Sequence, residues 1–271
     1  MKKLLFSLVT ASMMLSCSNS KSTLSKVERS ISEDSKLSAV LWQQTSAEYE
    51  ALCYQAFNAA SDYLSLVDND GLEASSKKKA IVMDLDETVL DNSPYNGWLI
   101  ENNKSYSDET WREWCMFEKA EFVPGAADFI DLATNRGFKI IFISNRSAED
   151  LEVTINNLEK EGIAVNQSDV LLKTSSSSKI ERREKVFVDY NVVMLIGDNL
   201  ADFNDQFDEA ELNINQRKEL IDKFKGQFGK KFIVLPNVMY GDWENTLKSN
   251  NNSDYIQNYN AYGLKKYIKT F

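Results

Sequence analysis

The sequence predicts an α/β fold with a central parallel sheet, N-terminal helices and a small inserted helical cap. Short apolar runs alternate with segments of helical periodicity, which favours parallel strands joined by right-handed helical crossovers. The runs are almost continuously apolar, as expected for strands that are buried on both faces. A stretch rich in aromatic residues interrupts the alternation after the first run. We interpret this stretch as the cap, although simple packing would also use such residues.

The expected elements follow in order along the chain. Apolar residues at three-and-four spacing predict one or two amphipathic helices between Ser35 and Leu66. The strands are expected at Ala80–Leu85, Phe138–Ile143, Val170–Leu172, Val192–Ile196 and Phe232–Leu235. The crossover helices are expected at Ala126–Arg136, Ala148–Glu161 and Ile180–Asp189. The main domain is expected to cover residues 35–245, with the cap at about 92–122 and a C-terminal helical tail at 246–271.

The first residues are typical of an exported protein. Two lysines precede an apolar run that is too short to span a bilayer, as in a secretory signal. Residues 14–17, Met-Leu-Ser-Cys, resemble a bacterial lipobox, in which Cys17 is lipidated. We therefore expect a signal peptide over residues 1–16, a lipidated tether over 17–34 and an extracytoplasmic, membrane-anchored protein. An ordinary secretory signal with a chance cysteine is the alternative. Ser18 stands where an aspartate is associated with inner-membrane retention, which favours the outer membrane.

Composition excludes several classes of function. The formal net charge of -10 argues against nucleic-acid polymers as partners, because their phosphates require clustered lysine and arginine. Histidine is absent, which removes histidine bases and nucleophiles and disfavours zinc. The basic runs Lys77–Lys79 and Arg182–Arg183 are expected to be solvated faces. Cys53 and Cys115 are free to pair outside the cytoplasm, but a buried free thiol is the favoured interpretation for Cys53.

Acidic residues follow two of the expected strands. Asp84 and Asp86 end the first strand two positions apart, and therefore point the same way. Asp198 and Asp202 follow the fourth strand, whose carboxyl end lies at the same edge of the sheet. Carboxylates that are buried together repel, and a divalent cation relieves the repulsion. Asp84, Asp86 and Asp198 can share one hard cation through oxygen, which favours Mg²⁺.

Polar residues at the ends of two further strands suit a phosphoryl group. Ser144, Asn145 and Arg146 follow the second strand, where a hydroxyl and a backbone amide can hold a phosphoryl oxygen. Lys173 follows the third strand directly, and Lys179 ends the serine run behind it. A lysine from this region can supply the positive charge that a transferring phosphoryl group needs. Taken alone, the residues do not decide between the two lysines.

Together these motifs resemble those of the haloacid dehalogenase superfamily, and more narrowly those of the class C acid phosphatases. Those are bacterial lipoprotein phosphatases with four signature aspartates, and several are 5'-nucleotidases. The resemblance spans about residues 36–245 and implies a haloacid-dehalogenase-like Rossmannoid domain. It rests on the segments VMDLDETVLDNS (82–93), ISNR (143–146), IGDNLADF (196–203) and MYGDWE (239–244), and on AVLWQQTSAEY (39–49), which is similar to the family's N-terminal helix.

The resemblance also implies roles for the acidic residues. Asp84 would attack phosphorus and form an aspartyl-phosphate. Asp86 would protonate the leaving alkoxide and then deprotonate the water that hydrolyses the intermediate. Asp84, Asp198 and the backbone carbonyl of Asp86 would bind Mg²⁺, and Asp202 would orient Asp198 or a metal-bound water. The expected activity is therefore that of a Mg-dependent acid phosphatase or 5'-nucleotidase.

The substrate that the resemblance implies is a nucleoside monophosphate. Trp111 and Tyr240 would clamp its base, and stacking tolerates every base. Ser144 and Lys179, which fits the family spacing, would bind the phosphoryl group, whereas Arg146 would either bind substrate or pair with an acid. Two alternatives stay open: a phosphatase for sugar phosphates or phosphorylated cofactors, and a non-catalytic surface lipoprotein with the same fold. The physiological substrate and the oligomeric state, a homodimer included, are also open.

Overall fold

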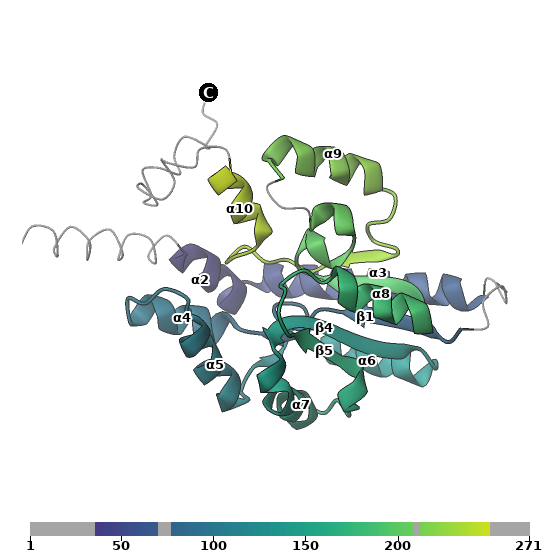
Figure 1. Ribbon diagram of the computed structural model, residues 1–271, viewed down its shortest axis with the longest axis horizontal. Coiled ribbons are helices and arrows are strands. Elements are labelled where there is room, and N and C mark those ends of the chain that lie inside the picture. The colour runs from purple at the N-terminus through teal and green to yellow at the C-terminus, as the bar shows by residue number, and fades with distance from the viewer. Residues whose placement is uncertain (1–35, 70–76, 209–211, 250–271) are drawn as a thin grey trace, which may run out of the picture.

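The computed structural model describes residues 36–69, 77–208 and 212–249. Its centre is a five-stranded sheet with strand order β5-β4-β1-β6-β7, in which every pair of neighbours is parallel (Figure 1). These strands are β1 (Lys79–Met83), β4 (Lys139–Ser147), β5 (Val170–Lys173), β6 (Asn191–Gly197) and β7 (Phe232–Val234). The chain first builds outward from β1 to β5 and then crosses to the other side of β1. The crevice at the carboxyl ends of β1 and β6 is therefore where such sheets bind ligands.

Helices lie on both faces of the sheet (Figure 1). The helices outside the cap are α2 (Leu37–Thr45), α3 (Ala47–Asn69), α6 (Ala126–Asn135), α7 (Leu151–Lys160), α8 (Ile180–Asp189), α9 (Ile214–Phe224) and α10 (Asp242–Ser249). Single 3-10 turns occur at Ala148–Asp150 (η1), Gln167–Asp169 (η2), Leu200–Asp202 (η3) and Asp205–Phe207 (η4). Among the described residues, no helix is both long and apolar enough to cross a membrane.

The two core layers are built from alternate residues of the strands. In β1, Ile81 and Met83 belong to the larger core, which α3, α6 and α7 complete. Ala80 and Val82 point to the opposite face and pack in a second core with Val186 of α8. Each fully buried large apolar side chain stabilises the fold by roughly 1.5–3 kcal/mol. Because β1 is buried on both faces, its carboxyl end is held rigidly between the layers.

The cap lies between β1 and α6. It consists of α4 (Ser93–Glu101) and α5 (Asp108–Phe117), and a short antiparallel ribbon of β2 (Leu90–Asp91) and β3 (Glu121–Phe122) closes it. Ser107 caps α5, because its side chain accepts a hydrogen bond from the backbone N–H of Thr110. Helix α2 packs against α4, so the N-terminal helices also support the cap.

The structure confirms the predicted fold class. Each expected strand overlaps an observed one, and the expected helix Ile180–Asp189 matches α8 in both bounds. The expected helix Ala148–Glu161 begins instead with the 3-10 turn η1. Helix α10 begins at Asp242, inside the expected main domain. The expected signal peptide, the tether with Cys17 and most of the expected tail lie outside the described residues.

Candidate active site at the carboxyl ends of the strands

A cavity of about 480 Å³ lies at the carboxyl ends of the central strands, beside the cap. It brings together most of the side chains that the sequence singles out. They are Asp84, Asp86, Trp111, Asn145, Arg146, Lys179, Asp198, Asp202 and Tyr240. Ser144 is fully buried and does not line the cavity, but its hydroxyl donates a hydrogen bond to Asp86. The structure therefore places these predicted residues, Ser144 excepted, on one cavity.

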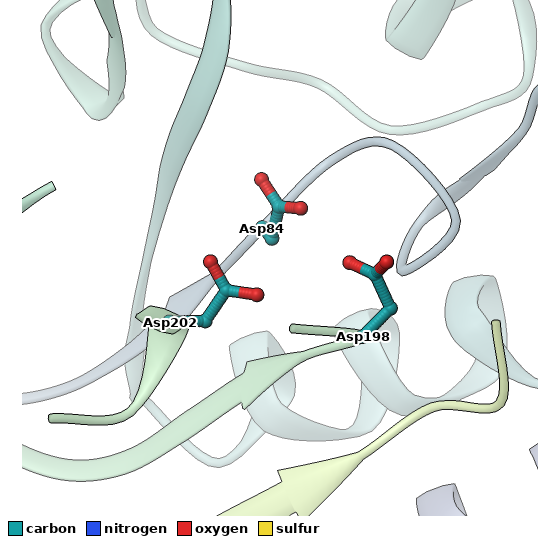
Figure 2. Close-up of side chains that lie close together, drawn as sticks. All are labelled: Asp84, Asp198 and Asp202. Atoms are coloured by element: carbon teal, nitrogen blue, oxygen red, sulfur yellow. The ribbon is translucent and has the colours of Figure 1, made fainter. Parts of the chain in front are cut away.

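Three of the four predicted metal-binding aspartates form one group. Asp84, Asp198 and Asp202 each offer a carboxylate oxygen, and these oxygens lie within 4.8 Å of one another (Figure 2). Burial raises the pKa of Asp84 well above its usual range; Lys179 opposes the rise and Asp202 adds to it. Burial, followed by the negative charge of Asp202, raises the pKa of Asp198 to about 7. These carboxylates therefore need positive charge nearby to stay ionised together.

A glycine makes the approach of Asp202 to the strand end possible. Asp202 Oδ2 accepts a hydrogen bond of 3.0 Å from the backbone N–H of Asn199, in a capping box that starts η3. The Asp202 side chain then lies against Gly197, the last residue of β6. A Cβ at Gly197 would stand 2.3 Å from Asp202 Oδ2 and 2.5 Å from its Cβ. Only glycine fits at this position without displacing the carboxylate.

Lys179 is the lysine that the structure places in the site. Its Nζ donates to Asp84 Oδ1 and to Asp202 Oδ1, each at 2.6 Å. Asp208 holds the preceding turn, because its Oδ2 accepts from Ser178 Oγ at 2.6 Å and from the Lys179 backbone N–H at 3.2 Å. Burial by itself lowers the pKa of Lys179, but the two carboxylates raise it overall, so the ammonium stays charged.

Asp86 has a different environment from Asp84. Its Oδ1 accepts from Arg146 Nε at 2.9 Å, from Arg146 Nη2 at 2.8 Å and from Asn92 Nδ2 at 3.0 Å. Its Oδ2 accepts from Ser144 Oγ at 3.2 Å. Burial by itself lowers the pKa of Arg146, but Asp86 raises it overall. Arg146 thus pairs with an acid, and Asp86 does not belong to the group of carboxylates that the other three aspartates form.

Aromatic side chains of the cap form one wall of the cavity. Trp111 packs edge-on against Tyr95, with ring centroids 5.1 Å apart. The Arg146 guanidinium carbon lies 5.8 Å from the centre of the Trp111 ring, a cation–π contact. Tyr240 reaches the same cavity from the segment before α10. That segment is anchored by Asn237, whose Nδ2 donates to Asp198 Oδ2 at 2.8 Å.

The expectation that Arg182 and Arg183 form a solvated face is wrong. Both side chains are buried. Arg182 donates to the Ser144 carbonyl at 2.5 Å and to Asn145 Oδ1 at 2.6 Å, and so fixes the loop after β4. The sequence held a signal for this burial. Arg182 and Arg183 lie three and four positions after Lys179, and residues at this spacing share one face of the predicted helix. Asn92 and Asn237 also contact the acidic residues, and nothing in the sequence alone indicated it.

The two cysteines in the described part of the chain are unpaired. Cys53 and Cys115 are both buried free thiols, which confirms the interpretation of Cys53. Cys53 belongs to the larger core, and Cys115 lies on α5 of the cap. Neither thiol lines the cavity described above.

Comparison with known proteins identifies a family. A family model described as "HAD superfamily, subfamily IIIB (Acid phosphatase)" matches residues 1–243. A crystal structure of the class C acid phosphatase from Bacillus anthracis with tungstate bound is 36% identical, covers 89% of this chain and 99% of that chain, and superposes with a TM-score of 0.80. A second structure of that enzyme is also 36% identical and gives a TM-score of 0.79 with the same coverage.

Curated relatives are more distant. The Stem 28 kDa and a Stem 31 kDa glycoprotein of Glycine max are each 32% identical over 136 residues, or 46% of this chain. The match covers 52% and 46% of those relatives, so the chain spans about half the length of the curated relatives it matches. Because the family model covers most of the sequence, the chain belongs to subfamily IIIB of the HAD superfamily, the acid phosphatase subfamily.

Proposed function

We propose that this protein hydrolyses phosphate monoesters through an aspartyl-phosphate on Asp84. The observation that supports this most directly is the presence of two carboxylates in one cavity with different partners. Asp84 faces a lysine and two further aspartates, whereas Asp86 is held by an arginine, an amide and a hydroxyl. Carboxylates whose environments differ in this way suit the separate roles of nucleophile and acid–base.

In the first step, a carboxylate oxygen of Asp84 attacks phosphorus while the bond from phosphorus to the ester oxygen breaks. Asp86 gives its proton to that oxygen, and the alcohol leaves. In the second step, water attacks the phosphorus of the aspartyl-phosphate and Asp86 accepts its proton. The bond between Asp84 and phosphorus breaks, and inorganic phosphate is released. Lys179 and the backbone N–H groups near Ser144 and Asn145 bind the phosphoryl oxygens in both steps.

A divalent cation fits the donors at this site. Asp84, Asp198 and Asp202 present only oxygen, their carboxylates lie within 4.8 Å of one another, and the sequence has no histidine. Oxygen-only donors suit Mg²⁺ rather than zinc. Asp84, Asp198 and the backbone carbonyl of Asp86 would hold the cation, with Asp202 behind them. When bound, it would neutralise the charge that develops on the phosphoryl oxygens.

We propose 5'-nucleoside monophosphates as substrates. Trp111 and Tyr240 line the cavity that holds Asp84, so a base can stack beside a phosphate at the nucleophile. Tungstate, an oxyanion with the tetrahedral shape of phosphate, is bound in the crystal structure of the Bacillus anthracis relative. Aromatic stacking is tolerant of base identity, so several nucleotides should serve.

We further propose that the protein acts outside the cytoplasm, anchored to the outer membrane by lipid on Cys17. The leader at residues 1–16 and the lipobox-like sequence support this. Metabolic labelling with a fatty acid tests it. Label should enter the protein in whole cells and should be lost in Cys17→Ser.

The activity is tested by measuring phosphate release from nucleoside monophosphates, sugar phosphates and p-nitrophenyl phosphate, with Mg²⁺ and after chelation. We expect turnover of nucleotides and of the aryl ester that depends on Mg²⁺. Preference for sugar phosphates would replace the nucleotide assignment while leaving the chemistry in place. If no ester in the screen releases phosphate with Mg²⁺ present, the proposed activity is wrong.

A further inference from the structure

The side chain of Asn92 has unusual hydrogen-bond partners. It is fully buried and stands at the N-cap of α4, where an asparagine side chain ordinarily accepts from the helix's own backbone N–H groups. Here the Asn92 side chain makes no such hydrogen bond. Asp91 takes that role instead and accepts from the Ser93 N–H at 2.8 Å. The Asn92 amide is thus committed to other groups.

Those groups connect the cap to Asp86. Asn92 Oδ1 accepts from the indole Nε1 of Trp114 at 2.7 Å, and Asn92 Nδ2 donates to Asp86 Oδ1 at 3.0 Å and to the Leu90 carbonyl at 3.2 Å. An indole N–H can only donate, and a carbonyl or ionised carboxylate can only accept. The amide therefore has one orientation that satisfies every partner. Trp114, helped by a longer contact of 3.5 Å from Arg146 Nη2 to the same oxygen, fixes that orientation and directs the N–H groups at Asp86.

The same contacts determine which oxygen of Asp86 can carry a proton. Oδ1 receives three N–H donors, two from Arg146 and one from Asn92, which leaves it no room for a hydrogen. Oδ2 has only the hydroxyl of Ser144, a group that can also accept. A proton held by Asp86 therefore resides on Oδ2.

We infer that Trp114 and Asn92 are positioning residues, which hold Asp86 so that Oδ2 presents its proton to the leaving oxygen. The inference rests on the proposed phosphatase activity. Trp114 is on α5, three residues after Trp111, so the helix that forms the cavity wall also orients the acid. The cap thereby takes part in proton delivery as well as in substrate binding.

The test compares two leaving groups. A nucleoside 5'-oxygen leaves only if it is protonated, whereas p-nitrophenolate is a stable anion and leaves without a proton. We measure kcat/KM, which extends only to the first irreversible step, for adenosine 5'-monophosphate and for p-nitrophenyl phosphate. In Trp114→Phe and in Asn92→Asp, we expect kcat/KM for the nucleotide to fall by about tenfold or more. This is part of the roughly 10²–10⁴-fold acceleration that general acid catalysis supplies. We expect kcat/KM for the aryl ester to fall by less than about threefold.

Asn92→Asp is a close probe, because it keeps an oxygen for Trp114 and places a second oxygen against Asp86 in place of the donor. The ratio of the two kcat/KM values comes from one preparation, so partial unfolding cancels. Trp98→Phe is the matched control, since this indole of the cap stacks on Tyr95 and lies beside Lys104, and the ratio should not change.

An unchanged ratio would overturn the positioning role while leaving the phosphatase activity intact. A nucleotide loss confined to KM would overturn it too, because that is the effect of lost stacking on Trp111 of the same helix. If the wild-type protein hydrolyses neither substrate, the activity and the inference fall together.

Discussion

Lys179 Nζ lies 2.6 Å from Asp84 Oδ1, so the proposed nucleophile shares a buried ion pair with a residue 95 positions away. The same ammonium lies 2.6 Å from Asp202 Oδ1. One cation thus joins the carboxyl end of β1, the turn after β6 and the start of α8. All three groups are buried, so both carboxylates rely on this one ammonium to stay ionised.

Replacing Lys179 with methionine should weaken both stability and activity. Two buried carboxylates would lose their shared cation, and breaking a buried pair costs roughly 3–5 kcal/mol. Phosphate release should fall by about a hundredfold or more, since a charged group that stabilises the transition state is commonly worth 10²–10³. Urea unfolding and steady-state kinetics measure the two effects. If the effects of Asp84→Asn and Lys179→Met on the free energy of unfolding simply add in the double variant, the energetic coupling is absent.

Asp84→Asn should abolish turnover while the protein stays folded. The amide cannot attack phosphorus, and losses of about 10³ or more are usual when a nucleophile is removed. Removing a carboxylate whose pKa is raised by burial relieves a desolvation cost, so the melting temperature should hold or rise. Asp131→Asn, at an exposed position on α6, is the control and should keep full activity. Full turnover in Asp84→Asn would refute the assignment.

Gly197→Ala should displace Asp202 and with it the acidic group. The added methyl would stand 2.3 Å from Asp202 Oδ2, so the carboxylate or the strand must move, and overpacking of this kind costs about 1–3 kcal/mol. We expect a large loss of activity and a higher Mg²⁺ requirement. Gly226→Ala is the matched control, because a Cβ there meets nothing within 4 Å. Equal behaviour of the two variants in a Mg²⁺ titration would contradict the steric argument.

Both described thiols should resist modification in the folded protein. Burial raises the pKa of Cys53 from 9.0 to about 11 and that of Cys115 to about 12. At pH 8 both stay protonated and unreactive, so Cys17→Ser should react with a thiol reagent only after denaturation. The unfolded chain releases these protons above about pH 9 and the folded chain does not, so stability should fall as pH rises from 9 towards 12. Rapid labelling of the native variant would contradict this.

Trp111→Ala should affect nucleotides selectively. Loss of a stacking surface costs about 1–3 kcal/mol per base, which predicts a KM for nucleoside monophosphates that is about ten- to hundredfold higher. A small sugar phosphate does not need the stacking surface and should be affected less. Steady-state kinetics on the two substrates separate these effects. A parallel loss on both would mean that Trp111 supports the cap or Arg146 rather than a base.

Much of the fold could be predicted from the sequence because of how parallel strands are buried. A strand such as β1, with a helical layer on each face, needs apolar residues at successive positions, and such runs stand out. Helix α8 was predicted with both bounds correct, although Arg182 and Arg183, and not a regular apolar face, fill most of its buried side. The start of α7 was missed, since 3-10 turns such as η1 are common at the ends of α-helices and no sequence pattern separates the two there.

The site could be predicted from the sequence for a different reason. Asp84, Asp86 and Asp198 follow strands directly, so topology alone brings them together. Contacts between distant positions could not be predicted. Asn92 hydrogen-bonds to Trp114 and Asp86 through side-chain geometry that no local sequence pattern encodes. Arg182 was misjudged because a pair of charges usually indicates solvent, and here its hydrogen-bond partners lie in the loop after β4.

The pairing of β2 with β3 has a consequence for how such a protein can diversify. Leu90 pairs with Phe122 and Asp91 with Glu121, so the chain leaves and rejoins the sheet domain at adjacent points. A segment whose ends already meet can change in length at little entropic cost and without shifting the register of β1. The cap can therefore vary in length between its ends, provided that Trp114 keeps its contact with Asn92. Insertions there would give descendants new substrate preferences, while mutations within the sheet would first have to preserve folding.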